Sequence, residues 1–266
     1  MMVAGVERHL AELGFRFGCN GPHAARTMML DELRALLAQV PAASRADYVT
    51  AIVERNQIDK PTRRTRELTA RHLAALYGLD LANPLFRALR RLWPHDERAQ
   101  PLLALVVALA RDPLLRMTWP LVQDTPIGTR LPREAVERHL ARDDPERFSA
   151  ASLTSFAQNT LGTWTAAGFL NGRVRKIRSA PVVQPENVAL CLFLGYLEGR
   201  SGQRLFKSSW MQLLGLPLDA LEALAGVAAE RGWLVLRQAG DVKEVRFPDM
   251  LTIDEERRRQ EVVHVL

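Results

Sequence analysis

Apolar residues recur at helical spacing along most of the chain, and the stretch 149–166 shows the pattern most clearly. At about 100° per residue, Leu153, Phe156, Leu161 and Trp164 fall on one side of a helix. The other side carries neutral polar groups and a glycine, at Ser155, Gln158, Asn159, Gly162 and Thr165. Gly168 predicts a left-handed helix end. Asn171-Gly172 then predicts a two-residue β-hairpin turn.

The predicted hairpin is strongly basic after its turn. Its cations are Arg173, Arg175, Lys176 and Arg178, and no Asp or Glu occurs from Arg147 to Pro185. A neutral polar helix followed by a basic hairpin is typical of a winged helix, which places the helix in a major groove and the hairpin on phosphates. We expect the base-facing residues to include Ser155, Gln158 and Asn159. The alternative is an amphipathic helix followed by a solvated, arginine-rich loop.

A second basic segment lies nearer the N-terminus. The apolar spacing predicts a helix over residues 23–40, another after a Ser44 cap to about Asn56, and a third from a Thr62 cap to Tyr77, ended by Gly78. The outer face of this third helix carries three cations, Arg63, Arg64 and Arg71, together with Glu67. They are candidates for phosphate contacts within a helix-turn-helix-like segment. The alternative is a solvated face with ion pairs at i,i+4 spacing.

Further helices predict a mainly α fold of several modules. Two apolar runs, Leu102–Ala110 and Val188–Leu197, are each about ten residues long. Since a membrane-spanning helix needs about 20, we interpret both runs as buried core helices. The second run belongs to a helix that begins at Pro185.

A second helix and hairpin follow, over residues 218–231 and 233–247, with the turn about Ala239-Gly240. The helix carries three acids, Asp219, Glu222 and Glu230, which would repel phosphates. This copy is therefore expected to contact protein or to be architectural. The predicted domains are an N-terminal arm or helix (1–24), a helical domain with the basic helix-turn-helix-like segment (25–145), a winged-helix-like unit (146–200), a second winged-helix-like unit (201–250) and a charged tail (251–266).

Composition favours a polyanionic partner and gives little support to catalysis. The 266 residues contain 36 Lys and Arg against 30 Asp and Glu, a net charge of +6. With two distant cysteines we expect reduced thiols and a cytoplasmic location. The chain lacks HExxH, GxxxxGK[ST], GxGxxG and GxSxG, so we expect no catalytic residues, no cofactor, no metal site and no small-molecule substrate.

Two segments resemble the BrxA family of BREX phage-defence systems. The first is IVERNQIDKPTRRTRELTARHLAALY at residues 52–77, in which a short helix ends in Asn, a Lys-x-Thr turn follows and a basic helix begins. The second is LGTWTAAGFLNGRVRKIRSAPVVQPENVALCL at residues 161–192, with a Gly-aromatic-Leu step, a basic stretch and a Pro-Glu helix start. The resemblance implies a mainly helical, non-enzymatic protein associated with DNA binding in phage restriction. This chain extends beyond the usual family core after residue 201.

The sequence therefore predicts a mainly α, non-enzymatic protein that binds double-stranded DNA and acts with other BREX-like defence proteins. Two alternatives stay open. One is an adaptor whose basic surfaces dock an acidic protein, and the other is a winged-helix transcriptional regulator.

Overall fold

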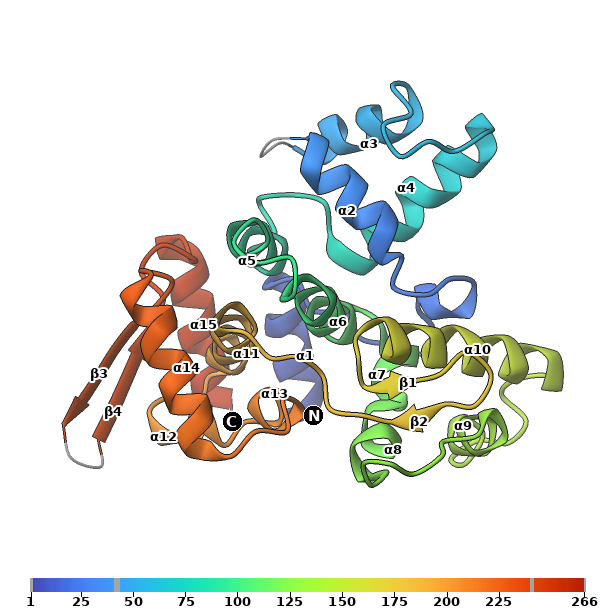
Figure 1. The fold of residues 1–266 in the computed structure, drawn as a ribbon. Coiled ribbons are helices and arrows are strands. Elements are labelled where there is room, and N and C mark those ends of the chain that lie inside the picture. Colours follow the sequence, from blue (N-terminus) through green and yellow to red (C-terminus); the bar gives the residue numbers. More distant parts are fainter. Residues whose placement is uncertain (1, 41–43, 240–241, 266) are drawn as a thin grey trace. The chain divides into compact units, whose positions relative to one another are not determined.

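The protein is mainly helical, with two short antiparallel hairpins, as a computed structural model shows for residues 2–40, 44–239 and 242–265 (Figure 1). This confirms the predicted fold class. The helices are α1 Met2–Glu12, η1 Pro22–Ala24 (3₁₀), α2 Leu30–Gln39, α3 Arg45–Val53, α4 Arg63–Tyr77, α5 Pro84–Leu92, α6 Gln100–Arg111, α7 Pro113–Met117, α8 Trp119–Asp124, α9 Arg133–Leu140, α10 Ala150–Ala166, α11 Pro185–Leu197, α12 Gln203–Phe206, α13 Ser209–Leu213, α14 Leu218–Glu230 and α15 Ile253–Val265. The strands are β1 Leu170–Asn171, β2 Ile177–Arg178, β3 Val235–Ala239 and β4 Val242–Arg246.

The chain forms two compact units, and each is assembled from separate stretches of sequence. Unit 1 contains residues 1–16, 82–106 and 182–266, and unit 2 contains residues 17–81 and 107–181. The division falls within α6 and again at Pro181-Val182. The domain boundaries predicted at 145/146 and 200/201 lie inside these units and do not coincide with their limits. Which of the predicted domains fold on their own therefore stays a prediction.

Unit 1 is built around α11. Of its 13 residues all except Tyr196 are buried, which matches the apolar run seen in the sequence. Gln184 and Asn187 form a capping box at its start, and Pro185 occupies the first turn, where a missing N–H is tolerated. Helices α5, α13 and α14 pack against it. Elsewhere in this unit, α1 packs against α15.

Unit 2 begins with the segment around η1 and the three helices α2, α3 and α4. The predicted caps are confirmed, since Ser44 forms a capping box with Asp47 and the Thr62 hydroxyl accepts from the Thr65 N–H. Gly78 ends α4 with a φ of 90°. The Tyr77 hydroxyl donates to the Met28 carbonyl, which ties the end of α4 to the chain that precedes α2.

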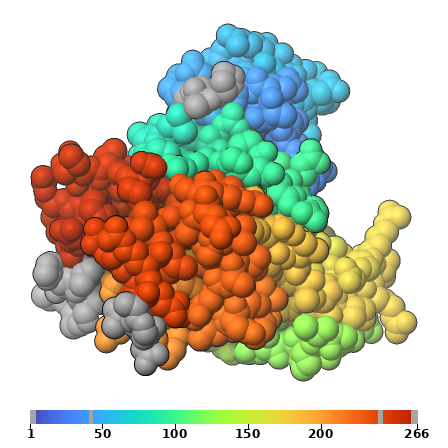
Figure 2. Space-filling model, turned by 60° about the vertical axis from the view of Figure 1, so that its left-hand side comes forward, coloured from blue at the N-terminus to red at the C-terminus, as the bar shows by residue number. Residues whose placement is uncertain are grey.

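The rest of unit 2 runs from the end of α6 to the β1–β2 hairpin. After α7 and α8, the chain passes beside β2, where Arg130 forms an antiparallel bridge to Ile177, and then continues through α9 and α10 into the β1–β2 hairpin. β1 pairs with β2 in the register Leu170↔Arg178 and Asn171↔Ile177. The yellow part of the chain, which contains α10 and this hairpin, lies at the surface and projects from it (Figure 2).

Two local predictions were wrong. The helix expected over residues 23–40 begins only at Leu30, because His23 is held in a buried polar cluster and Met29 adopts a left-handed φ of 53°. The hairpin expected to turn on Asn171-Gly172 instead has a five-residue loop, residues 172–176, since Asn171 pairs with Ile177. The Gly172 carbonyl accepts from Lys176 Nζ at 2.8 Å, which closes this longer loop.

Within the described part of the chain, no single helix is both long and apolar enough to cross a membrane. The sharply bent pair Gln203–Leu213 and Leu218–Glu230 meets that test when its two helices are counted together, by length and composition alone.

We expect Leu192→Ala in α11 to lower the free energy of unfolding by about 2–5 kcal/mol, since the side chain is fully buried and its removal leaves a cavity. Leu218→Ala is the control, because that leucine is 48% exposed and its loss should cost about 0.5 kcal/mol. Urea unfolding followed by circular dichroism measures both. Equal losses would contradict the central position of α11.

Candidate nucleic-acid interface

Helix α10 is held in unit 2 by one apolar face and capped at its start. The Ser149 hydroxyl accepts from the Ser152 N–H at 3.2 Å, as expected for an N-cap. Trp164 is buried, packs edge-on against Phe169, and donates its indole N–H to the Thr118 hydroxyl at 2.8 Å. Gly168 ends the helix at a φ of 84°, as predicted. The helix is therefore fixed in rotation, and the face that it leaves exposed is defined.

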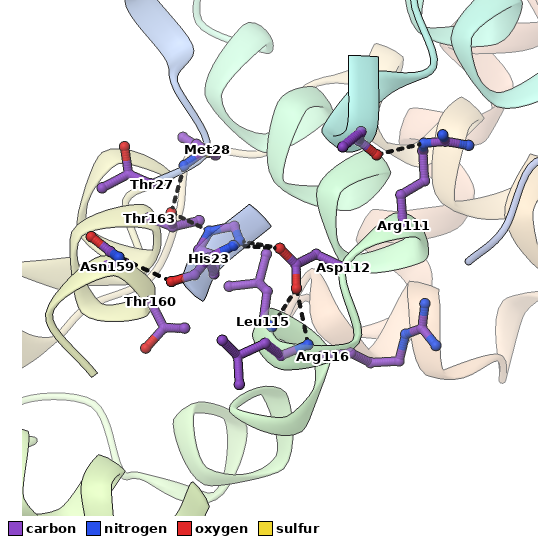
Figure 3. Close-up of polar contacts among 12 residues, drawn as sticks. His23, Thr27, Met28, Arg111, Asp112, Leu115, Arg116, Asn159, Thr160 and Thr163 are labelled. Carbon is purple, nitrogen blue, oxygen red and sulfur yellow. Dashed lines mark hydrogen bonds and ion pairs between the residues drawn. The ribbon is translucent and has the colours of Figure 1, made fainter. Parts of the chain in front are cut away.

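A buried polar cluster fixes the same helix from another side (Figure 3). The ring of His23 lies between Asp112 and Thr163, with Nδ1 2.7 Å from the carboxylate and Nε2 2.7 Å from the hydroxyl. All three side chains are fully buried. Since Nδ1 faces a carboxylate, it carries the hydrogen in this arrangement. The Thr163 hydroxyl also accepts from the Met28 N–H at 2.8 Å.

Asp112 is satisfied on both carboxylate oxygens. Oδ2 accepts from the backbone and ring of His23, and Oδ1 accepts from the N–H groups of Leu114 and Leu115 at the start of α7. Burial opposes ionisation, but the hydrogen bonds and charge of His23 and the backbone donors hold the pKa of Asp112 below its usual value. The cluster therefore has a structural role, joining η1, α7 and α10.

Asn159 was predicted to contact bases; it is half-buried, and its amide nitrogen forms a hydrogen bond within the protein. Its side-chain Nδ2 donates to the His23 carbonyl at 2.9 Å, so the amide holds the 22–28 segment against α10 (Figure 3). Gly162 lies close to the same segment, because a Cβ there would be 3.0 Å from the Thr27 methyl. Gln158 remains exposed and Ser155 is half-buried, so these two predicted residues stay on the accessible side.

Arg178 was predicted to bind phosphate, and this was wrong. The residue is 9% exposed, and its guanidinium donates to the carbonyls of Val122, Phe169 and Ser179. It also stacks over the Phe169 ring at 5.0 Å. Burial lowers the pKa of Arg178 from its ordinary value. The guanidinium therefore fastens the base of the hairpin to α8 and the end of α10, and it is not available to DNA.

The hairpin tip has a preset shape and exposed cations. Gly172 has a φ of 94°, and a Cβ at that position would lie 2.1 Å from the Arg175 carbonyl oxygen, so only glycine fits. Lys176 is half-buried and its pKa is lowered by burial. Arg173 and Arg175 are exposed, and neither forms an ion pair with any described residue. The predicted cations therefore divide into a structural pair, Lys176 and Arg178, and a free pair at the tip.

A groove of about 440 Å³ lies between α10, the hairpin and the start of α9. Gln158, Leu161 and Gly162 line it from α10, and Arg173, Val174 and Lys176 line it from the hairpin. The third wall is residues 130–134, which contribute Arg130 and Arg133. Arg133 forms ion pairs with Glu134 at 3.4 Å and with Glu137 at 3.0 Å. The groove is basic through Arg130, Arg173 and Lys176, with the exposed amide of Gln158 at one side.

Arg130 and Arg133 were not singled out in the sequence. They flank Leu131-Pro132 at the start of the helix that follows Pro132. No sequence pattern links these two arginines to a hairpin about 40 residues later. The link is the pairing of residues 128–131 with β2, in which the N–H groups of Gly128 and Leu131 donate to the carbonyls of Arg178 and Lys176. A local pattern could not have revealed this pairing.

The basic face of α4 is partly neutralised. Arg63 is exposed but forms ion pairs with Glu54 at 2.9 Å and Glu67 at 3.1 Å, which raise its pKa. Arg64 and Arg71 are also exposed, and no ion pair to either was found across the described ranges. The pKa of the neighbouring His72 is lowered by burial and by the charges of Arg71 and Arg26.

The second hairpin, β3–β4, offers its charges mainly to its own unit. Lys243 forms an ion pair with Glu222 and lies 5.0 Å from the centre of the Phe206 ring. Arg237 and Arg246 both pair with Glu244. Asp219 and Glu230 on α14 are exposed. No group of three or more His, Cys, Asp or Glu with metal-binding geometry was found where the structure describes the chain.

The helices and short hairpins define the protein as a mainly α protein. No protein-family model matches the chain, and no curated protein is similar enough to match it. A solved structure titled "SspB crystal structure" is similar over 97% of this chain and 99% of that chain, with a TM-score of 0.54 and 13% identity. At this identity the likeness concerns the fold alone.

We expect Arg178→Ala to lower the free energy of unfolding by about 1–3 kcal/mol, because it leaves buried carbonyls without their charged donor. Arg175→Ala should change it by no more than about 0.5 kcal/mol, since that side chain is exposed. Chemical denaturation of the two variants beside the parent protein tests this. An unchanged free energy of unfolding in Arg178→Ala would contradict the structural role of this guanidinium.

The lowered pKa of Asp112 predicts a specific pH dependence. A carboxylate with a depressed folded-state pKa contributes stability above its unfolded value, near pH 4, and loses it as the pH falls through the folded-state pKa. Asp112→Asn should therefore be less stable than the parent at pH 7, and the gap should narrow below about pH 4. Asp143→Asn is the control, because Asp143 is 77% exposed. A gap that is constant down to pH 2 would show that Asp112 is not the titrating group.

Proposed function

We propose that this protein is a non-enzymatic DNA-binding protein that contacts duplex DNA through α10 and the β1–β2 hairpin. The observation that carries the proposal is the basic groove between α10, the start of α9 and the hairpin, which the Arg130–Ile177 bridge brings together. Arginine and lysine on two walls of this groove match the charge of a sugar–phosphate strand. The exposed apolar side chain of Val174 in the same groove suits the deoxyribose.

Helix α10 supplies the group suited to a base edge. Gln158 is exposed beside the groove, and a glutamine amide pairs with the major-groove edge of adenine. Ser155 lies one turn earlier on the helix and is half-buried, so it is suited to a phosphate or a base edge. Asn159 and Arg178 contribute indirectly, because they hold the helix and the hairpin in place.

The second predicted contact is α4, for which Arg64 and Arg71 are the candidates. Their exposed guanidinium groups lack acidic partners among the residues described, in contrast to Arg63. These residues belong to the same unit as α10, so one unit carries both candidate contacts.

The biological setting is proposed from the sequence resemblance. The segments 52–77 and 161–192 favour a cytoplasmic component of a BREX-like phage-defence system, acting on double-stranded DNA with other proteins of that system. The adaptor alternative keeps the same basic surfaces but uses them on an acidic protein. The transcriptional-regulator alternative differs because it predicts a strong preference for one operator sequence.

Binding to plain duplex DNA separates these possibilities. We expect retarded mobility with duplex in the presence of a metal chelator, and weaker retardation with single-stranded DNA or RNA of the same length. An adaptor would bind none of the three. A regulator would lose at least about 1000-fold in affinity on random duplex relative to its operator.

The hairpin contribution is tested by the salt dependence of binding. Each phosphate contact adds about 0.9 to the slope of log K against log [salt], so Arg173→Ala with Arg175→Ala should flatten the slope by about 2 units. The matched control is Arg237→Ala with Arg246→Ala, which removes the same charge from exposed positions on the other hairpin. An unchanged slope in the first variant, or equal flattening in both, would contradict the assignment.

A further inference from the structure

A groove of about 730 Å³ is formed within unit 1 alone, by residues that the proposed function does not use. It lies between α15 and the chain segment that leaves β4, and Tyr196 of α11 also lines it. Its volume falls within the range of about 300–1,000 Å³ that is typical of ligand-binding clefts. The groove is therefore large enough to hold several side chains of a ligand.

Helix α15 presents one of its faces to this groove. Ile253, Glu256, Arg257 and Gln260 line the groove, and their spacing of three and four residues places them along one stripe of the helix. The stripe begins with an apolar residue and continues with a cation one turn later. A ligand in the groove therefore meets apolar surface and positive charge side by side.

The start of α15 is anchored on another side of the helix. Arg87 donates to the Met250 carbonyl at 3.0 Å and also to the carboxylate of Glu255. The same carboxylate accepts from the Thr252 N–H at 2.7 Å, which caps the helix. The stripe is therefore presented from a fixed support, and this reduces the entropy lost on binding.

The apolar part of the groove combines a buried floor with an exposed edge. Phe247 is 4% exposed and packs edge-on against Phe193, so it belongs to the floor. Leu251 is half-buried, and Ile253 is 82% exposed. Covering these last two side chains removes apolar surface from water, which favours a ligand with an apolar side chain of its own.

The one acid among the described residues that line the groove, Glu256, is neutralised within the protein. Its Oε1 accepts from the Tyr196 hydroxyl at 3.0 Å and lies 2.8 Å from Arg259 Nη2. The Arg259 guanidinium also lies 3.9 Å from the centre of the Tyr196 ring. Burial raises the pKa of Tyr196 to about 12, so its hydroxyl keeps its proton and remains a donor at neutral pH. Glu256 therefore adds little negative charge to the groove.

Two arginines, one from each wall, line the groove with exposed guanidinium groups. Arg246 on β4 is 67% exposed and pairs with Glu244, and Arg257 on α15 is 69% exposed and pairs with Asp254. Exposed ion pairs of this kind contribute little to stability, so a carboxylate of a ligand can replace either acid. Arg257 uses Nη1 for Asp254, at 3.2 Å, and a guanidinium has further N–H groups for a second carboxylate.

We propose that this groove binds an acidic segment of a partner protein, in which an apolar side chain lies between two carboxylates. The apolar side chain packs on Leu251 and Ile253, and the carboxylates bind Arg246 and Arg257. In an extended segment, residues two apart point to the same side and lie about 6.6 Å from each other. Ile253 and Arg257, one helical turn apart, have a similar spacing of about 5–6 Å between Cβ atoms. The matching pattern is acid-x-apolar-x-acid.

The distribution of charge favours a peptide over a nucleic acid. The carboxylates of Glu244, Asp254 and Glu256 lie beside the arginines of this surface. A nucleic-acid strand carries a negative charge at every phosphate, so part of it would face these acids. A peptide can place its carboxylates at the two exposed arginines alone.

The test uses the full-length protein and an array of synthetic decapeptides. One series carries Glu-x-apolar-x-Glu, with Leu, Ile, Phe or Met at the centre and varied residues at x. Matched series replace both glutamates by Gln or by Lys, or the apolar residue by Ser. We expect retention on the first series, and fluorescence anisotropy should show at least about tenfold tighter binding than to the matched Gln and Ser peptides.

Reversing the charge of the groove tests the role of the arginines. Arg246→Glu with Arg257→Glu should weaken binding of the acidic peptides at least about tenfold, and it should strengthen binding of the Lys series. The matched control is Arg8→Glu with Arg98→Glu, because both arginines are exposed in local ion pairs of the same unit and do not line the groove.

The apolar contact is tested by Ile253→Ser, which we expect to weaken binding by about tenfold. Leu218→Ser is the control, because Leu218 is also a partly exposed apolar residue at the first position of a helix in this unit. It should leave the affinity unchanged. A circular dichroism melting curve shows that each variant is folded.

The outcomes separate this inference from the proposed function, on which it does not rest. An array without enrichment of the acidic-apolar series, or equal losses in the groove variants and their controls, overturns the peptide site and leaves DNA binding intact. Peptide binding without duplex binding overturns only the proposed function. If duplex DNA competes with the peptides and the charge-reversed variant loses affinity for both by the same factor, the groove is a nucleic-acid contact and the inference is wrong.

Discussion

The imidazole of His23 joins three segments of unit 2 that are far apart in the sequence, and the position of α10 depends on it. Its two ring nitrogens contact Asp112 at the start of α7 and Thr163 within α10, 89 and 140 residues further along the chain. The ring and both of its neighbours are removed from water, so each hydrogen bond is strengthened and each missing partner would be costly. Asn159 then uses the His23 carbonyl, and Met28 uses the Thr163 hydroxyl. The polar residues on one face of α10 therefore hold the helix in place, and the face that lines the groove remains available to a ligand.

The cationic side chains are divided in the same way: some stabilise the fold, and others are exposed and can bind a ligand. Arg178 and Lys243 are buried or nearly so, and their cations are satisfied within their own units. Arg173 and Arg175 differ from Arg178 by only a few positions, yet they are exposed at the hairpin tip. A cluster of cations in a sequence therefore shows the charge of a segment, but it does not show which of these side chains are buried and which are exposed. The pleat of β2 and the nearby carbonyls decide which guanidinium turns inward.

Much of the helical framework follows from local signals. Thr62 and Gly78 bound α4, Pro185 opens α11 and Gly168 closes α10, because caps, φ preferences and missing donors act over a few residues. The neutral polar face of α10 and the exposed tip arginines were also predictable from spacing. Local patterns could not predict the parts of the candidate site that depend on contacts between residues far apart in the sequence. The helical pattern of residues 23–29 is overridden by the buried ring of His23, Asn159 is taken by a carbonyl 136 residues earlier, and Arg130 reaches the groove through a bridge to Ile177.

The discontinuous path of unit 2 also affects how the protein is made. Ribosomes add about 5–20 residues per second, so His23 precedes Thr163 by roughly 7–28 seconds of synthesis. During that interval α2, α3 and α4 can form from local caps, but the 22–28 segment lacks the hydroxyl that later fixes it. Residues 82–106, which belong to the other unit, are synthesised during this interval. Unit 2 cannot complete its fold until α10 has been synthesised. Helix α10 is thus the last long helix of unit 2 to be synthesised, and the nascent chain acquires its groove only when that unit closes.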